Sequence, residues 1–203
     1  MDLYKGFLFH GRYQLVELLG CGASAEVWKA KDTKANALIV ALKIFSQHTT
    51  MDSYGLQNFE REFTTVYNMK HSNLLPPTGY DIFQGRPYLV MQYCENGSCS
   101  SMAGRADEQD VVKFLHDVAA GLEYLHDHNI IHQDIKPDNI LLDDNCNFLV
   151  TDFGISVAST EDNAGAAASG GTRAYMAPER FKGITGKASD VWSMGATAVE
   201  KLL

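Results

Sequence analysis

The sequence predicts an α+β fold in two parts, a strand-rich first half with one main helix and a mostly helical second half. From Tyr13 to about Met91, short apolar and β-branched runs alternate with Gly, Asp and Asn, which is the pattern of strands joined by turns. Residues 58–70 differ, because their apolar side chains recur every three to four positions and predict a helix. After Gly97 helical spacing dominates, so a short join near 92–97 is expected between the two parts.

The second half is predicted to contain two helices and a hairpin. Residues 108–126 have an amphipathic helical period, and a helical pattern returns from Ala188 to the end of the chain. The short apolar runs 140–142 and 148–150 flank a polar segment with turn chemistry, which predicts a β-hairpin. Residues 161–171 are rich in Ala, Gly and Ser without periodicity, and are predicted to form a loop.

The composition indicates a globular protein whose main partner is neither nucleic acid nor an anionic membrane. Of the 203 residues, 45% are hydrophobic and 21% are charged, which is enough apolar content to bury a core. The formal net charge is −8, whereas nucleic acid or an anionic lipid surface would favour a basic patch. No run approaches the roughly 20 apolar residues of a membrane span, and the N-terminus lacks the features of a signal peptide. The four cysteines show no CxxC spacing, so a reduced, cytoplasmic setting is expected.

Three features of the first half suit phosphate binding, although each of them alone is common on protein surfaces. The segment Gly20-Cys-Gly-Ala-Ser-Ala25 follows a predicted strand, and glycine lets a backbone approach a phosphate closely. A second strand follows this turn where a dinucleotide-binding fold would have a helix. Lys43 ends an apolar strand, and Glu62 lies on the predicted helix, where it is placed to pair with Lys43.

A loop with three polar side chains carries the strongest evidence for a particular chemistry. The segment Ile130-Ile-His-Gln-Asp-Ile-Lys-Pro-Asp-Asn-Ile-Leu-Leu142 places Asp134, Lys136 and Asn139 just ahead of a short strand. Thr151-Asp-Phe-Gly154 follows at the end of the predicted hairpin. This order resembles the protein-kinase family, in which the catalytic loop reads HRDxKxxN and the metal-binding motif reads DFG. The further motifs that match in order and spacing are Met176-Ala-Pro-Glu179 and Asp190-Val-Trp-Ser-Met-Gly195.

The resemblance runs from about Tyr13 to the end of the chain, and Lys136 and Thr172 place it with the eukaryotic-like (Hanks-type) serine/threonine kinases. It implies a two-lobed kinase fold and an enzyme that transfers the γ-phosphate of ATP, assisted by Mg²⁺, to Ser or Thr hydroxyls of protein substrates. The implied divisions are an N-terminal extension at 1–12 and a kinase domain at 13–203, with an N-lobe at about 13–92, a hinge at about 92–97 and a partial C-lobe at about 98–203.

The resemblance implies a catalytic role for each matching residue of the second half. Asp134 would accept or orient the proton of the substrate hydroxyl, and Lys136 would steady the γ-phosphate. Asn139 and Asp152 would hold the Mg²⁺ ions. Thr172 would contact the catalytic loop directly.

The resemblance also implies a set of ATP contacts. Lys43, oriented by Glu62, would hold the α- and β-phosphates. The remaining implied contacts are Leu19, Gly20 and Gly22 at the glycine-rich turn, Val27, Ala41 and Leu141 around the adenine ring, Met91 behind it, Gln92 and Cys94 at its edge, and Ser98 at the ribose.

Two other functions compete with a protein kinase. A pseudokinase would be a nucleotide-binding or scaffolding module, and it would be favoured by loss of Lys43, Asp134, Asn139 or Asp152, all of which are present. A small-molecule kinase of the same fold is disfavoured because residues 172–179 resemble the family's protein-substrate platform.

The sequence departs from the family pattern at several positions. Ala25 stands where the third glycine of the turn is usual, and Gln133 replaces the arginine that receives an activation-loop phosphate in the family. A neutral amide cannot form that charged clamp, so our hypothesis is that activity does not need phosphorylation of this segment. The phosphorylation positions concerned are Ser156, Ser159, Thr160 and Ser169.

The end of the sequence is a further departure. In the family Glu179 pairs with an arginine well beyond the Asp190 helix, but here the last arginine is Arg180, so we expect Glu179 to lack this partner and the C-lobe to be incomplete. The histidines at 116, 126 and 128 have no matching ligand set, and we expect them to be solvated.

Overall fold

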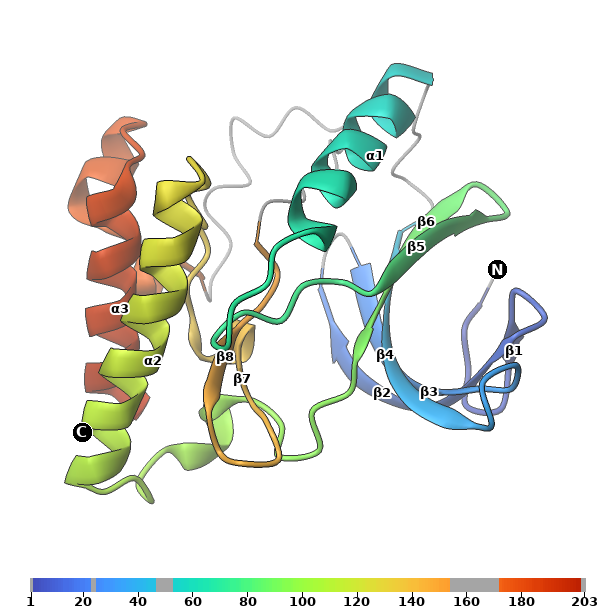
Figure 1. Ribbon diagram of the computed structural model, residues 1–203, viewed down its shortest axis with the longest axis horizontal. Helices are drawn as coiled ribbons and strands as arrows, with labels where there is room; N and C mark the ends of the chain where they lie inside the picture. The colour runs from blue at the N-terminus through green and yellow to red at the C-terminus, as the bar shows by residue number, and fades with distance from the viewer. Residues whose placement is uncertain (1, 23–24, 47–52, 154–171, 202–203) are drawn as a thin grey trace. The chain divides into compact units, whose positions relative to one another are not determined.

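The computed structural model describes residues 2–22, 25–46, 53–153 and 172–201 of the chain (Figure 1). These residues form two compact units, which confirms the predicted two-part α+β organisation. The first unit consists of the described residues of 1–67 and 77–93, and the second consists of those of 68–76, 94–155 and 163–203. The predicted loop at 161–171 and the four candidate phosphorylation positions lie outside the described residues.

The first unit is an antiparallel sheet with one helix, and its strands follow the order β1-β2-β3-β4-β6-β5. The elements are β1 (Leu8–Phe9), β2 (Tyr13–Cys21), β3 (Ala25–Asp32), β4 (Leu38–Phe45), α1 (Ser53–Tyr67), β5 (Gly79–Phe83) and β6 (Arg86–Gln92). Alternate residues of the central strands are buried in one core, as half-buried strands with a period of two require. The members of this core are Phe9, Tyr13, Leu15, Trp28, Ala30, Val40, Leu42, Ile44 and Tyr88.

Two details of the first unit differ from the sequence-based expectation. β1 was not predicted, because two residues are too short for a periodic pattern, yet Phe9 is fully buried and packs edge-to-face on Tyr88 at 5.0 Å. Helix α1 begins at Ser53 and ends at Tyr67, whereas 58–70 was predicted. The apolar period marks the buried positions, and Met69 is buried and continues that period although it lies beyond the end of the helix.

The second unit is mostly helical, as predicted. Its elements are η1 (Cys99–Met102), α2 (Glu108–Asp127), η2 (Pro137–Asn139), β7 (Ile140–Leu142), β8 (Phe148–Val150), η4 (Thr172–Tyr175), η5 (Pro178–Lys182) and α3 (Lys187–Lys201), where η denotes a 3₁₀ helix. The predicted helix at 108–126 and the predicted hairpin are confirmed, and the last helix starts one residue before the predicted position. None of the helices that the structure describes has the length and apolar character to cross a membrane.

Helix α2 packs against both α3 and β8, as Figure 1 shows in yellow-green beside red and orange. Its start is set by a capping box, in which the Asp107 carboxylate accepts the Asp110 N–H at 2.9 Å and the Asp110 carboxylate accepts the Asp107 N–H at 3.1 Å. Gly121 lets α2 lie close to the segment before β5, because a Cβ added there would stand 2.8 Å from the carbonyl oxygen of Asn73.

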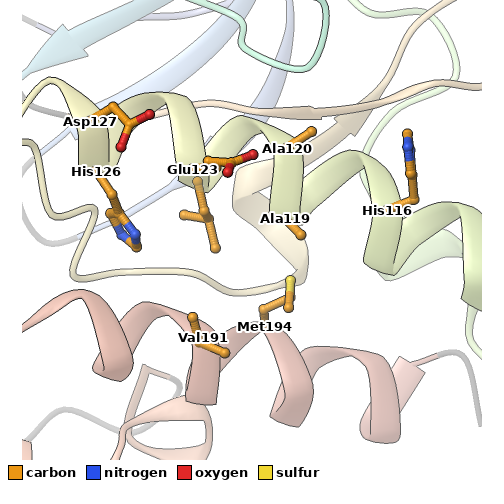
Figure 2. Close-up of a pocket in the computed structure, with 9 residues that line it drawn as sticks. His116, Ala119, Ala120, Glu123, His126, Asp127, Val191 and Met194 are labelled. Carbon is orange, nitrogen blue, oxygen red and sulfur yellow. The ribbon is translucent and has the colours of Figure 1, made fainter.

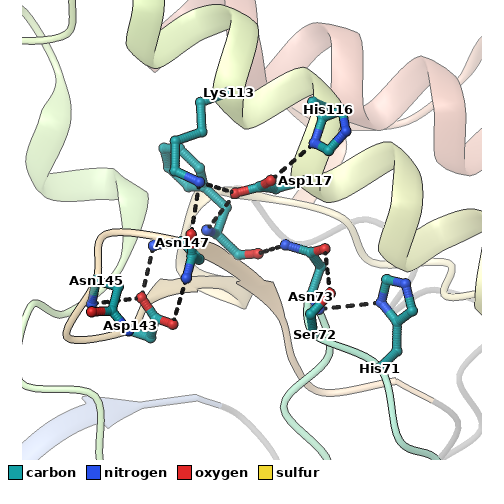
Figure 3. A network of polar contacts seen from close by, with 10 residues as sticks. His71, Ser72, Asn73, Lys113, His116, Asp117, Asp143, Asn145 and Asn147 are labelled. Atoms are coloured by element: carbon teal, nitrogen blue, oxygen red, sulfur yellow. Dashed lines mark hydrogen bonds and ion pairs between the residues drawn. The ribbon is translucent and has the colours of Figure 1, made fainter.

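A buried carboxylate ties the hairpin to α2 (Figure 3). Asp117 Oδ2 accepts hydrogen bonds from Lys113 Nζ at 2.7 Å and from the Phe148 N–H at 3.1 Å. Lys113 Nζ also donates to Asn147 Oδ1 at 2.8 Å, so the two elements share one cation. Burial opposes ionisation of Asp117, but the hydrogen bonds from Lys113, His116 and Phe148 outweigh it and hold its pKa below the ordinary value.

Candidate catalytic site

Four of the predicted ATP-binding residues of the first unit lie on one face of its sheet. Val27 pairs directly with Lys43, and Ala41 pairs directly with Met91, and such cross-strand partners share a face. Successive residues of a strand face opposite sides, and Leu42, which separates Ala41 from Lys43, belongs to the core. The four side chains therefore line the face opposite the core, as an ATP-binding surface would need.

The two glycines of the glycine-rich segment lie at the end of β2 and directly after it. Gly20 pairs with Val27, and the Gly22 N–H donates to the Ala25 carbonyl at 2.9 Å. A Cβ added at Gly20 would meet no described atom within 4 Å, so packing within the protein does not demand glycine there. The remaining predicted residues of this unit are Leu19, which is exposed in β2, and Gln92, which ends β6.

An aromatic pair joins the strand that carries Lys43 to the helix that carries Glu62. Lys43 Nζ lies 5.4 Å from the centre of the Phe45 ring, and that ring packs edge-to-face on Phe59 of α1 at 5.8 Å. Glu62 is half-buried and lies nearly one turn after Phe59 on the buried face of the helix. The face of α1 that carries Glu62 is thus directed toward the end of β4 that carries Lys43.

In the second unit, the three polar side chains of the loop before β7 contact one another. Asp134 Oδ2 accepts hydrogen bonds from Lys136 Nζ at 2.8 Å and from Asn139 Nδ2 at 3.2 Å. Asn139 Nδ2 also donates to the Asp134 carbonyl at 2.8 Å, which ties the two ends of the loop together. Asp134 Oδ1 is buried and accepts no hydrogen bond from any described residue. One carboxylate oxygen is therefore fixed by a cation and an amide, while the other is left as an acceptor.

His132 fixes the backbone on which Asp134 stands. Its Nδ1 accepts the Asp134 N–H at 3.2 Å, and its Nε2 lies 2.8 Å from the carbonyl oxygen of Thr151. Because a ring nitrogen that accepts an N–H carries no proton, this geometry assigns the neutral tautomer, with Nε2 donating to Thr151. The buried imidazole therefore connects the loop to the strand β8 that leads to Asp152.

Asp190, at the start of α3, holds the same loop from the other side. This carboxylate is only 1% exposed, and it accepts the His132 N–H through Oδ2 and the Gln133 N–H through Oδ1, each at 2.8 Å. His126 Nε2 lies 2.8 Å from Asp190 Oδ2, which corrects the expectation that His126 is solvated, because it is buried at the end of α2. The motif around Asp190 was evident from the sequence, but the role of this carboxylate was not.

The two residues predicted to hold Mg²⁺ are linked through the backbone. The Thr151 N–H donates to the Asn139 carbonyl at 3.0 Å, and Asp152 follows Thr151 with a φ of 67°, which turns its backbone sharply. Both hydrogen bonds of the Asn139 side chain use Nδ2, so its oxygen takes no part in them. Within the described part of the chain, no three His, Cys, Asp or Glu side chains form a cluster able to hold a metal ion.

Three predicted ATP contacts of the second unit also lie together. Cys94 belongs to a small apolar cluster against which Leu141 packs, and Ser98 forms a β-bridge with Leu141. Burial raises the pKa of the Cys94 thiol to about 11, with a smaller effect from nearby acidic residues, so this cysteine is a packing residue and not a reactive thiolate.

The segment before α3 contains two contacts that the sequence did not predict. Glu179 is half-buried and accepts a hydrogen bond from Ser189 Oγ at 2.9 Å, so its carboxylate has a neutral donor where the family has an arginine. Arg180 donates from its guanidinium to the Gln133 carbonyl. Thr172 begins η4, and its side chain lies outside the described part of the structure.

A groove of about 570 Å³ runs along the packed pair α2 and α3, and Figure 2 shows side chains of both helices that line it. Ala119, Val191 and Met194 give it an apolar floor, and Glu123 and Asp127 add carboxylates. None of the predicted catalytic or ATP-binding residues lines this groove, so it is separate from the candidate site.

Comparison with known proteins identifies the family to which these features belong. The family model described as protein kinase domain matches residues 13–203. CBL-interacting serine/threonine-protein kinase 2 of Arabidopsis thaliana is 33% identical over 190 residues, which cover 91% of this chain and 41% of that protein. CBL-interacting protein kinase 9 of Oryza sativa subsp. japonica is 30% identical over 192 residues, covering 91% and 42%. A probable serine/threonine-protein kinase of Dictyostelium discoideum is 31% identical over 203 residues, covering 98% and 40%.

A solved structure shares the fold. The crystal structure of a mutant form of the Mycobacterium tuberculosis PknI kinase domain matches with a TM-score of 0.72 at 24% identity, covering all of this chain and 77% of that one. By contrast, the chain spans less than half the length of the three curated relatives in the preceding paragraph.

Proposed function

Because this chain belongs to the protein kinase domain family, we propose that it transfers the γ-phosphate of ATP to serine and threonine hydroxyls of protein substrates. The proposed domain begins near Tyr13, where the family match starts, and residues 1–12 precede it. A cytoplasmic setting fits the four cysteines, all of which are free thiols.

The observation that carries the proposal is the environment of Asp134. A group that accepts or orients a hydroxyl proton needs a carboxylate oxygen that is held in place yet has no donor of its own. Asp134 meets this need, because Lys136 and Asn139 hold Oδ2 while Oδ1 has no partner among the described residues. The substrate hydroxyl would donate to this carboxylate, whose side chain is 39% exposed, and Lys136 would present its remaining ammonium protons to the transferred phosphoryl group.

The donor set of the second unit fits Mg²⁺. This ion prefers oxygen ligands and is commonly bound through one or two carboxylates together with substrate phosphates, not by a cage of protein ligands. Asp152 supplies a carboxylate and Asn139 an amide oxygen that its own hydrogen bonds leave unused. When bound, Mg²⁺ would neutralise charge on the phosphate oxygens. The described geometry of these two residues is fixed by the hydrogen bond from the Thr151 N–H to the Asn139 carbonyl.

For the nucleotide, we propose a set of contact residues in each unit. In the first unit, the proposal rests on the common sheet face of Val27, Ala41, Lys43 and Met91, which offers an apolar surface and one cation. Lys43 would hold the α- and β-phosphates and Glu62 would orient it, which is supported by the aromatic contact between β4 and α1. The further proposed contacts are Leu19, Gly20, Gly22 and Gln92 in the first unit and Cys94, Ser98 and Leu141 in the second.

The proposal is tested by measuring γ-phosphate transfer to a generic protein substrate and nucleotide binding on the same samples. Lys43→Met and Asp134→Asn should each reduce transfer by about 100-fold or more, because the first removes the cation that holds the α- and β-phosphates and the second removes the group that accepts or orients the hydroxyl proton. Asp134→Asn should leave nucleotide binding nearly unchanged. Asp144→Asn, which changes an exposed acid of the hairpin turn in the same way, serves as the matched control.

The outcomes separate the competing functions. Nucleotide binding without any transfer would favour a pseudokinase that acts as a binding or scaffolding module. Transfer to a small molecule but not to protein would favour a small-molecule kinase. Transfer that is unaffected by both substitutions would overturn the assignment of Lys43 and Asp134.

A further inference from the structure

Three short segments of the second unit meet in a closed set of hydrogen bonds next to Asp134. Asp190 of α3 accepts the Gln133 N–H, and Ser189, its neighbour, donates to Glu179 of η5. Arg180, the next residue of η5, donates from its guanidinium to the Gln133 carbonyl. The catalytic loop, the segment η5 and the first turn of α3 are therefore linked pairwise through adjacent residues.

Gln133 is held at both ends of its backbone. It has a φ of 69°, in the left-handed region that a residue with a side chain adopts at a cost of order 1 kcal/mol and that surrounding contacts must maintain. Its N–H is bound to Asp190 and its carbonyl to Arg180. The side chain of Gln133 is exposed and is used by neither contact.

The contact with Arg180 bears directly on Asp134 because of peptide geometry. The carbonyl of Gln133 and the N–H of Asp134 belong to one rigid, planar peptide unit. Arg180 binds the oxygen of this unit, and His132 Nδ1 accepts its N–H at 3.2 Å. Because both edges of this plane are held by hydrogen bonds, the orientation of the peptide that carries the Asp134 Cα is fixed.

We propose that Arg180 is a positioning residue for Asp134, acting through the Gln133 carbonyl, and this inference rests on the proposed kinase function. Gln133 offers no charged side chain to order the loop, so the cation that reaches this peptide comes from η5 instead. The contact also joins the loop to η5, which is anchored to α3 through Glu179 and Ser189. Displacement of a catalytic group by about 1 Å can reduce the rate as much as 100-fold. This sets the upper end of the loss of rate that we expect when the Arg180 contact is removed.

The test compares four variants of the 203-residue chain. Arg180→Ala removes the contact, and Arg180→Lys keeps a cation that can donate to one carbonyl. Lys182→Ala removes an exposed positive charge from the same short segment and is the control for net charge. Gln133→Ala removes the side chain but keeps the backbone carbonyl. It is the control that tests whether Arg180 acts through the carbonyl and not through the side chain. Amide hydrogen exchange at Gln133 and Asp134, the melting temperature, and kcat and KM for ATP are measured for each.

Arg180→Ala should raise the exchange rate of the Asp134 amide by about tenfold or more and lower kcat by about 10- to 100-fold, while KM for ATP changes less than about twofold. Arg180→Lys should recover part of both losses. Lys182→Ala and Gln133→Ala should match the wild type.

Three results would overturn the inference. These are unchanged amide exchange in Arg180→Ala, an equal loss in Lys182→Ala, or a loss in Gln133→Ala as large as that in Arg180→Ala. If Arg180→Ala does not fold, Arg180→Lys and Gln133→Ala still show whether Arg180 acts through the carbonyl of Gln133 or through its side chain. Absence of phosphate transfer by the wild type would contradict the proposed function alone, because the exchange measurement remains valid without it.

Discussion

The Oδ1 atom of Asp190 lies 2.8 Å from the backbone nitrogen of Gln133, which precedes it by 57 residues. Through Oδ2, the same carboxylate accepts the N–H of His132 and contacts the ring of His126. A single buried acid thus connects the end of α2, the loop of Asp134 and the start of α3. Buried N–H groups are costly to leave unpaired, so this carboxylate sets the conformation of the loop as well as the packing of the helices.

Replacement of Asp190 should therefore destabilise the second unit. Asp190→Ala leaves one buried N–H group, one partly buried N–H group and one imidazole without their partner, at a cost of roughly 3 kcal/mol in the free energy of unfolding. Urea denaturation measures this change. Asp127→Asn, at the exposed end of α2, is the control and should change stability by less than about 0.5 kcal/mol. Equal stability of Asp190→Ala and the wild type would contradict the role assigned to this carboxylate.

Two helical glycines should respond oppositely to alanine. At Gly121 of α2 a new Cβ would stand 2.8 Å from the backbone oxygen of Asn73, so Gly121→Ala should destabilise the protein by about 1–3 kcal/mol. At Gly195 of α3 no described atom lies within 4 Å of the added Cβ, so Gly195→Ala should stabilise it by about 0.5–1 kcal/mol. Thermal unfolding of both variants would reveal the difference, and a Gly121→Ala variant as stable as the wild type or more stable would show that the close approach at Gly121 is wrong.

The contribution of Asp117 should depend on acidity. Its pKa in the folded protein is lowered, because hydrogen bonds from Lys113, His116 and Phe148 outweigh the effect of burial. The stabilisation is therefore fully present above the unfolded pKa of about 4 and is lost as the pH falls through the lower, folded value. The wild type should exceed Asp117→Asn in unfolding free energy by about 2 kcal/mol at neutral pH. This difference should shrink below about pH 4, and a difference that is constant with pH would refute the argument.

The cysteines should differ in reactivity toward a maleimide. Cys21 and Cys146 are exposed, whereas Cys94 and Cys99 are buried. With a pKa of about 11, Cys94 is a thiolate in roughly one molecule in a thousand at about pH 8. Mass spectrometry of the folded protein should find label on Cys21 and Cys146 long before Cys94. Equal labelling of Cys94 would mean that it is not the packing residue described here.

Phosphorylation of the segment between the two catalytic motifs should not be needed for activity. Gln133 lacks the charge that would bind a phosphate, so simultaneous replacement of the four candidate acceptors by alanine should change kcat by less than about threefold. These acceptors are Ser156, Ser159, Thr160 and Ser169. Loss of phosphate transfer in this variant, with the fold retained, would show that the hypothesis is wrong.

Much of the fold was predictable because its signals are local. Helix α2 has an amphipathic period over many residues and an acidic cap at Asp107, and the hairpin has two apolar runs around a polar turn. Helix α1 was predicted with the wrong bounds, since the buried positions alone produce the period that the sequence shows. The two-residue strand β1 depends on pairing with β2 and leaves no period to detect.

The order of Asp134, Lys136, Asn139 and Asp152 along the chain was enough to predict a site that resembles that of the kinase family. The contacts that hold these side chains in place became visible only in the folded structure. Hydrogen bonds that join Asp190 to His132 and Gln133, or Arg180 to Gln133, connect residues about fifty positions apart, and no spacing or composition encodes such a pair. Polar contacts of this kind form only after hydrophobic packing has brought the helices and the loop together.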